Sequence, residues 1–176
     1  MATNNKIDVI IDDDNWAKVA VVSEAKCCAI FDLVRQYLTD NNVATKAGLN
    51  NIAKPLHAVL NLSNAEEVQR LNAEFRNMDR PTNVLSFANI DSDDFTEVLR
   101  HDEVIELGDI IMAWEVLRDE AMQKAIASEN HFIHLLVHGL LHLLGFDHQN
   151  DDEAEIMEGV EIGVLKLMNI DNPYEE

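Results

Sequence analysis

The sequence predicts an α+β fold in which a small mixed sheet of about four strands is covered by helices. Short runs rich in β-branched residues are predicted to be strands. Longer stretches with apolar residues every three or four positions are predicted to be amphipathic helices. Their order along the chain is strand, helix, strand, helix, two strands and then helices, which is typical of a sheet packed against helices.

The first part of the chain is predicted to contain two strands and two helices. Residues 7–11 form the first strand, which a run of aspartates ends. Apolar residues recur at helical spacing over residues 16–41 and predict one long helix. Residues 56–62 alternate as a second strand. Ser63 is expected to cap the following helix, with Glu66 completing a capping box.

The rest of the chain is predicted to add two strands and several helices. Pro81 ends the preceding helix, because proline disfavours a helical residue before it. A break near residues 128–130 separates two of the later helices. The predicted elements are strands at 84–87 and within 107–112, and helices near 114–121, over 131–144 and around 156–167.

Length and composition favour one globular domain over residues 1–176. The 176 residues fall within the roughly 100–200 that one domain usually has, and 47% of them are apolar. No apolar run approaches the roughly 18–20 residues that span a bilayer, and the acidic N-terminus does not resemble a signal peptide. The two cysteines are adjacent and cannot join distant segments. We therefore expect a cytoplasmic protein without a membrane partner.

The formal charge of −20 argues mildly against a nucleic-acid partner. A strongly acidic surface favours solubility and repels nucleic acid at long range. Runs of acidic residues usually form solvated loops or helix starts. An RNA substrate would therefore require a local basic or metal-bearing groove.

The helix predicted over 131–144 carries the most informative motif. His138 and His142 are four residues apart, which places them on one helix face about 5–6 Å apart at Cβ. Gly145 is expected to end the helix in a left-handed conformation, which reverses the chain. His148 can then return towards the same point. The spacing predicts that these three histidines bind one metal ion.

The ligand set indicates a catalytic zinc site. Three neutral imidazoles leave Zn²⁺ with its full charge and one open coordination position, whereas a closed structural site commonly includes thiolates. Such a site lowers the pKa of a bound water and polarises a carbonyl or phosphoryl oxygen. Because imidazole sites also accept nickel, copper and iron, the spacing alone does not select the metal.

Two further residues are candidates for proton transfer. His134 shares the histidine face, but His134 and His142 are about 12 Å apart along a helix. Zinc–nitrogen bonds are only about 2.0–2.1 Å long, so we expect His134 outside the ligand set, either behind it or facing substrate. Asp147, next to His148, is a candidate to orient a ligand, to act as a base, or to form a turn.

The zinc-protease motif H-E-x-x-H offers the first comparison, since its glutamate is the general base. Gly139 occupies the position of that glutamate. Peptide hydrolysis by the usual route is therefore disfavoured, although a carboxylate from elsewhere in the chain could replace it.

Three segments resemble the YbeY family, the bacterial endoribonucleases of ribosomal-RNA maturation. The segment HGLLHLLGFDH at 138–148 resembles the family signature. LNAEFR with RPTNVLSF, within 71–87, and LGDII at 107–111 resemble two further blocks in the same order. The resemblance covers roughly residues 57–150. It implies a zincin-like fold, one Zn²⁺ on the three histidines, hydrolysis of single-stranded RNA rather than DNA, and association with the small ribosomal subunit in rRNA maturation and ribosome quality control.

The resemblance also implies a role for Arg76, which matches the family's functionally important arginine. A guanidinium recognises a phosphate with two parallel hydrogen bonds and stabilises charge in a transition state. Arg76 would then balance the phosphate charge while His134 or Asp147 moves a proton. Two alternatives stay open. One is a non-catalytic assembly factor that binds ribosomal proteins or a ribosome-associated GTPase, and the other is a metallohydrolase of another substrate such as peptides.

Overall fold

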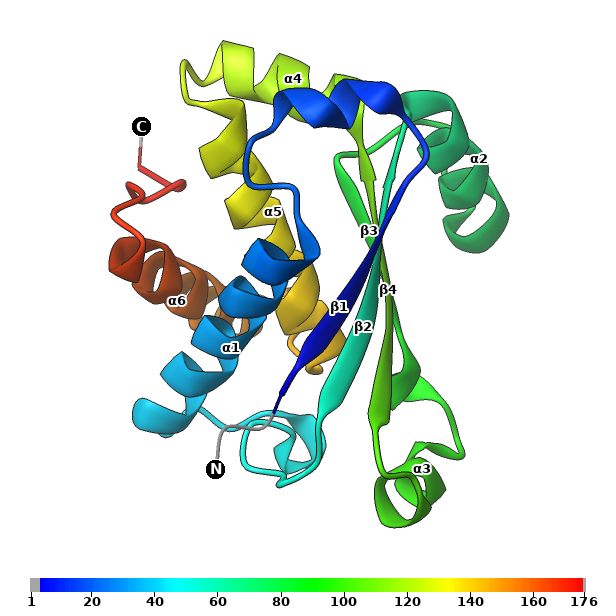
Figure 1. Cartoon of the computed structure of the whole chain (residues 1–176), viewed down its shortest axis with the longest axis vertical. Helices are drawn as coiled ribbons and strands as arrows, with labels where there is room; N and C mark the ends of the chain where they lie inside the picture. Colours follow the sequence, from blue (N-terminus) through cyan, green and yellow to red (C-terminus); the bar gives the residue numbers. More distant parts are fainter. Residues whose placement is uncertain (1–3, 176) are drawn as a thin grey trace.

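The computed structural model of the chain describes residues 4–175 and contains one mixed sheet with helices on both of its faces (Figure 1). The sheet has the order β1-β2-β4-β3. β1, β2 and β4 run parallel, whereas β3 is antiparallel to β4 and forms one edge. The predicted α+β class with a small mixed sheet is confirmed. The strands are β1 (Lys6–Ile11), β2 (Leu56–Ser63), β3 (Val84–Ala88) and β4 (Ile105–Ala113).

The helices form two layers on one side of the sheet and a partial layer on the other. α1 and α5 pack against one face with α6 behind them, and α2 covers the opposite face beside β3 and β4 (Figure 1). α3 was not predicted from the sequence. The helices are α1 (Glu24–Asp40), α2 (Ala65–Arg76), α3 (Phe95–His101), α4 (Trp114–Gln123), α5 (Ser128–Leu143) and α6 (Asp151–Leu167), with short 3₁₀ turns η1 (Asp14–Lys18), η2 (Lys46–Gly48) and η3 (Asn89–Asp91).

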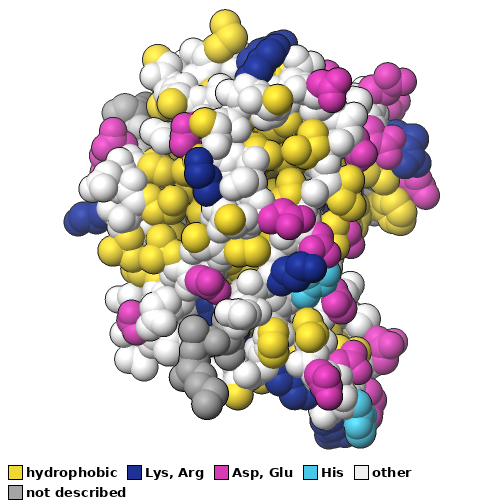
Figure 2. Space-filling model, in the orientation of Figure 1, with side chains coloured by type: hydrophobic (Ala, Val, Ile, Leu, Met, Phe, Trp, Pro, Cys, Tyr) yellow, Lys and Arg dark blue, Asp and Glu magenta, His cyan; other side chains and the backbone are white. Residues whose placement is uncertain are grey.

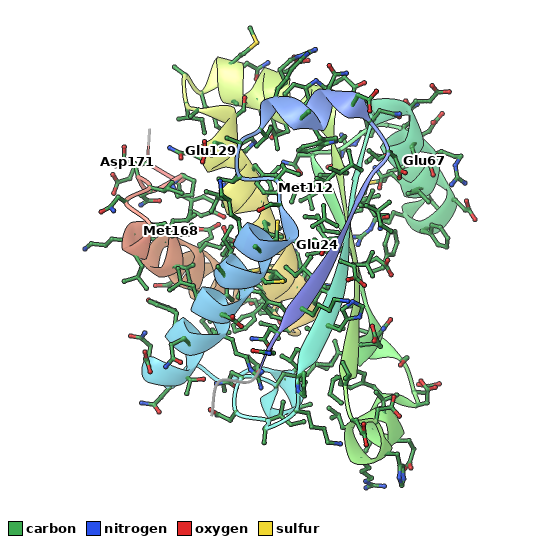
Figure 3. The ribbon with its side chains drawn as sticks, viewed as in Figure 1. Glu24, Glu67, Met112, Glu129, Met168 and Asp171 are labelled. Carbon is green, nitrogen blue, oxygen red and sulfur yellow. The ribbon has the colours of Figure 1, made fainter. Side chains whose placement is uncertain are left out.

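The main core lies between the sheet and the helices α1 and α5. Alternate residues of β2 are fully buried on this side, as the alternating pattern predicts. In Figure 3, Met112 points from β4 towards the helices, whereas Glu67 points outward from α2. α5 is buried along most of its length, because it packs against the sheet on one side and α6 on the other. The histidines on α5 therefore stand on a rigid element. Within residues 4–175, no helix has both the length and the apolar character that a membrane span requires.

The prediction of one helix over residues 16–41 is wrong. Residues 14–18 form η1 instead, and α1 begins at Glu24. Trp16 is fully buried and its indole N–H donates to the Ser63 carbonyl at 2.8 Å, which holds η1 against the sheet. The Ser23 hydroxyl accepts from the Lys26 amide at 3.2 Å and starts α1 as an N-cap. The apolar periodicity therefore spans two separate elements.

The predicted capping box is also wrong, by one residue. Asn64 caps α2, since its side-chain oxygen accepts from the Glu67 amide at 2.9 Å. Ser63 instead ends β2, where it pairs with Ala113. Serine and asparagine are comparable N-caps, so the extra length of β2 decides between them.

Candidate metal centre

The end of α5 brings the three predicted histidines together. His138 and His142 lie one turn apart on α5, and His148 follows the turn at Gly145. One ring nitrogen from each histidine lies within 4.8 Å of the others, a group that could hold a metal ion. The Nε2 atoms of His138 and His142 are 3.1 Å apart. The three histidines therefore lie close together, as the spacing predicted.

The hydrogen bonds of two rings select the tautomer that a metal requires. His142 Nδ1 donates to the Phe146 carbonyl at 3.0 Å, and His138 Nδ1 donates to the Glu161 carboxylate at 2.6 Å. A carbonyl and an ionised carboxylate can only accept, so each Nδ1 carries the proton. When both rings are neutral, the two Nε2 atoms present lone pairs to each other at 3.1 Å. Because a cation between them removes this repulsion, the donor set fits a bound metal ion.

The protonation states fit the same interpretation. Burial, with the neighbouring His138 and His148 rings, lowers the pKa of His142 to about 4. Burial alone would raise the pKa of Glu161, but hydrogen bonds from His134 and His138 outweigh it and lower the pKa to about 2. At neutral pH the site therefore combines a neutral His142, the form that binds metal, with an ionised Glu161 behind His138.

Adding one methyl group at Gly145, where the chain reverses, is expected to lower both the stability of the protein and its affinity for zinc. Gly145 has φ +94°, and a Cβ there would lie 2.4 Å from Lys46 Cβ. We expect Gly145→Ala to cost about 1–3 kcal/mol from backbone strain alone, and to displace His148. Urea unfolding of the metal-free protein measures the first effect, and zinc affinity measures the second.

Gly159 on α6 provides the matched control for this substitution. A Cβ at Gly159 meets nothing within 4 Å, and the residue is helical and exposed. Gly159→Ala should therefore stabilise the protein by about 0.5–1 kcal/mol. An unchanged urea midpoint for Gly145→Ala would contradict the proposed strain.

The histidines open into a cleft that also contains Arg76. The cleft has a volume of about 920 Å³ and is lined by His138, His142 and His148, by β3, and by the C-terminal end of α2. Arg76 is the last residue of α2, and its Nη2 donates to the Ser86 carbonyl on β3 at 3.0 Å. The three histidines and Arg76, which the sequence analysis singled out separately, therefore line one cleft.

The cleft has a different charge balance from the molecule as a whole. On the face shown in Figure 2, acidic side chains gather over α2 and α3 with basic side chains between them. Arg70, Arg100 and Arg118 pair with nearby carboxylates. Arg76 and Arg80 both line the cleft, and no carboxylate within residues 4–175 lies at ion-pair distance from either. The lining also includes Lys46, which pairs with Asp91, and the carboxylates of Asp147 and Glu153. Two guanidinium groups are therefore available to an anionic ligand in a cleft that holds charges of both signs.

The two remaining candidates lie in different surroundings. His134 is only 8% exposed, and its Nε2 donates to Glu161 at 2.8 Å, behind the ligand His138. Asp147 lines the cleft, and its carboxylate accepts from the His148 amide and the Gln149 side chain, both at 2.8 Å. These bonds hold the Asp147 carboxylate beside His148.

Sequence reasoning missed Glu161, which contacts both His134 and His138. The available signal was an acidic residue within the apolar face of the last predicted helix. Glu161 is fully buried and follows Met157 and Val160 on that face of α6. A charge at such a position needs hydrogen-bond partners, and the histidines of α5 supply them.

Known proteins similar to this chain are endoribonucleases. The family model described as endoribonuclease YbeY matches residues 28–169. Proteins named endoribonuclease YbeY from Acinetobacter baumannii strains ACICU and SDF are 50% and 49% identical over 112 residues, which are 63% of this chain and 69% of each relative. A solution structure from Thermotoga maritima matches with a TM-score of 0.51 and 18% identity, covers 97% of this chain and 99% of its own, and supports the fold alone. The chain belongs to the YbeY family of endoribonucleases.

Proposed function

We propose that the chain is a zinc-dependent endoribonuclease that cleaves single-stranded RNA in maturation of the small-subunit ribosomal RNA and in ribosome quality control. One observation carries the proposal: a three-histidine group and two guanidinium groups line the same cleft. A phosphodiester is the anionic group that such a combination suits. The names of the relatives support RNA as its source.

The three histidines would hold the ion through Nε2 of His138, Nε2 of His142 and one nitrogen of His148. When bound, zinc lowers the pKa of a water molecule and polarises a phosphoryl oxygen. The chain's own contribution is to keep the ring protons on Nδ1 and to orient the rings. Phe146 and Glu161 do this through the two Nδ1 hydrogen bonds.

Arg76 binds the phosphate in this proposal. One of its nitrogens is held by the Ser86 carbonyl, and the guanidinium lies 5.9 Å from the centre of the Phe87 ring. The remaining N–H groups are free to make two parallel bonds to a phosphate and to stabilise the negative charge that grows in the transition state. Arg80 offers a second contact to the RNA backbone.

A preference for single strands fits the aromatic residues beside Arg76. Phe75 is 59% exposed and contacts Phe87 edge to face, with ring centres 5.4 Å apart. Unpaired bases stack on exposed aromatic rings, whereas paired bases in a duplex are already stacked. Phe75 therefore offers a surface to an unpaired base next to the bound phosphate.

We assign proton transfer to Asp147 rather than to His134. Asp147 lines the cleft, whereas His134 is buried and bonded to Glu161.

Peptide hydrolysis is less well supported than RNA cleavage. A Cβ at Gly139, the position of the protease glutamate, would lie 3.0 Å from the Ile110 side chain. A glutamate at this position would have to displace part of the core.

The proposal also covers the fold type of the enzyme, its domain organisation and its cellular partners. The antiparallel edge strand β3 beside the histidines of α5 supports a zincin-like arrangement. We propose a single domain over residues 1–176 that works in the cytoplasm with the small ribosomal subunit, its proteins and a ribosome-associated GTPase.

Metal removal and strand specificity test the function together. The purified protein is treated with a chelator, dialysed, and given a labelled single-stranded RNA or the same RNA in a duplex. We expect cleavage of the single strand only, loss of cleavage after chelation, and recovery on addition of zinc. Equal cleavage before and after chelation would contradict the proposed role of the metal, and equal cleavage of the duplex would contradict the strand preference.

A further inference from the structure

A buried carboxylate connects the metal-binding helix to the C-terminal segment of the chain. Glu161 on α6 is 0% exposed. One of its oxygens accepts from His138 Nδ1 at 2.6 Å, and the other accepts from His134 Nε2 at 2.8 Å. The Tyr174 hydroxyl donates to this second oxygen as well. Three donors from two separate parts of the chain therefore satisfy one carboxylate.

The C-terminal segment reaches this carboxylate by turning back after α6. Figure 1 shows the segment beside α5 and α6, and Met168 and Asp171 mark its course in Figure 3. The Tyr174 ring packs edge to face on His134, with centres 5.6 Å apart. Segment 168–175 is thus attached to His134 and Glu161, the two side chains that lie behind His138.

Part of this network also lines a second cavity. It has a volume of about 340 Å³ and borders His138 and His148 as well as Glu161 and Tyr174. Water in this cavity can compete for the Glu161 oxygens once the Tyr174 hydroxyl is removed. Tyr174 therefore limits the ways in which Glu161 can be solvated or can rotate.

We propose that Glu161 and Tyr174 are positioning residues of the metal site. Glu161 holds the proton of His138 on Nδ1, sets the orientation of the ring and makes Nε2 a stronger ligand. Tyr174, together with His134, holds the second oxygen of Glu161 and so keeps the first one aimed at His138. The inference rests on the metal centre of the proposed function, but it does not depend on RNA as the substrate.

The test compares zinc affinity in three variants by competition with a chromogenic chelator. Glu161→Gln keeps the size of the side chain but removes its charge, and we expect about 10–100-fold weaker zinc binding. Tyr174→Phe keeps the ring against His134 and removes only the hydroxyl, and we expect a smaller loss in the same direction. Tyr37→Phe is the control, because Tyr37 also packs on α6, near Gly163, outside this network. Its zinc affinity should equal that of the wild type.

A second readout separates positioning from a purely structural role. Cobalt in place of zinc gives visible absorption bands that depend on ligand geometry, and we expect these bands to shift in Tyr174→Phe but not in Tyr37→Phe. Wild-type zinc affinity and an unchanged cobalt spectrum in Tyr174→Phe, with only a lower unfolding midpoint, would overturn the inference. If Glu161→Gln does not fold, the Tyr174→Phe result decides alone. A wild-type chain that binds no zinc would overturn the metal centre itself, a separate failure from that of the positioning residues.

Discussion

Replacing His142 with alanine is expected to remove tight zinc binding and to reduce RNA cleavage by more than the roughly 10–100-fold that loss of an outer partner costs. Within residues 4–175, His142 is one of three histidines grouped so that they could hold a metal ion, and its Nε2 lies 3.1 Å from that of His138. Two remaining imidazoles cannot hold the ion in a tetrahedral site with one open position. Zinc content after dialysis and the rate of single-stranded RNA cleavage measure the two effects.

His101→Ala is the matched control for this substitution. His101 is an exposed histidine of α3 that lies 3.2 Å from Glu97, outside the metal centre. Its loss should change neither zinc content nor cleavage. If His142→Ala keeps one tightly bound zinc ion and full activity, the ligand assignment is wrong.

Arg76→Ala is expected to lower kcat/KM for single-stranded RNA by about 100- to 1,000-fold and to leave zinc affinity unchanged. Arg76 contacts Ser86 and Phe87, and its proposed partner is the phosphate, so its loss should not disturb the three histidines. Arg76→Lys should recover only part of the activity, because an ammonium is a point charge without the planar fork of a guanidinium. Steady-state kinetics with zinc-loaded protein measure the effect.

Arg118→Ala controls for the loss of one positive charge. Arg118 lies on α4 and pairs with Asp119 at 2.7 Å, away from the cleft. Its removal should leave kcat/KM unchanged. Full activity of Arg76→Ala, or an equal loss in both variants, would show that Arg76 does not recognise the phosphate.

The sequence predicted best those features that depend on neighbours along the chain. The alternation in β2 and the histidine spacing on α5 are local patterns, and both correspond to the observed elements. The long helix over 16–41 was wrong because apolar spacing does not reveal that Trp16 is held by a distant carbonyl. The strand order, with β3 antiparallel at an edge, depends on contacts across the whole chain and could not be predicted.

The candidate site likewise combines residues that local sequence patterns predict with residues that they do not. His138, His142 and His148 could be predicted because a single helix and one glycine turn bring them together. The nearness of Arg76 to the histidines arises from the packing of α2, β3 and α5, so only the family resemblance indicated it. Glu161 and Tyr174 depend on how α6 and the following segment return to α5, which no local pattern specifies.

The net charge of −20 does not by itself decide whether the chain binds RNA. Composition sums all charges, whereas a ligand responds most strongly to those close to it, because salt screens exposed charges beyond about 8–10 Å. Many basic side chains here are paired with carboxylates, but Arg76 and Arg80 face the cleft without such partners among residues 4–175. These two guanidinium groups can therefore attract a phosphate despite the net charge, although Asp91, Asp147 and Glu153 also line the cleft.

The histidine group is proposed to hold one zinc ion on which RNA cleavage depends. Titration of metal-free protein with zinc, while the cleavage rate of a single-stranded RNA is followed, tests it most directly. The rate should start near zero, rise in proportion to added zinc, and level off at about one ion per chain, the number that three histidine ligands hold in an open site. A metal-free protein that cleaves RNA as fast as the zinc-loaded one would contradict it.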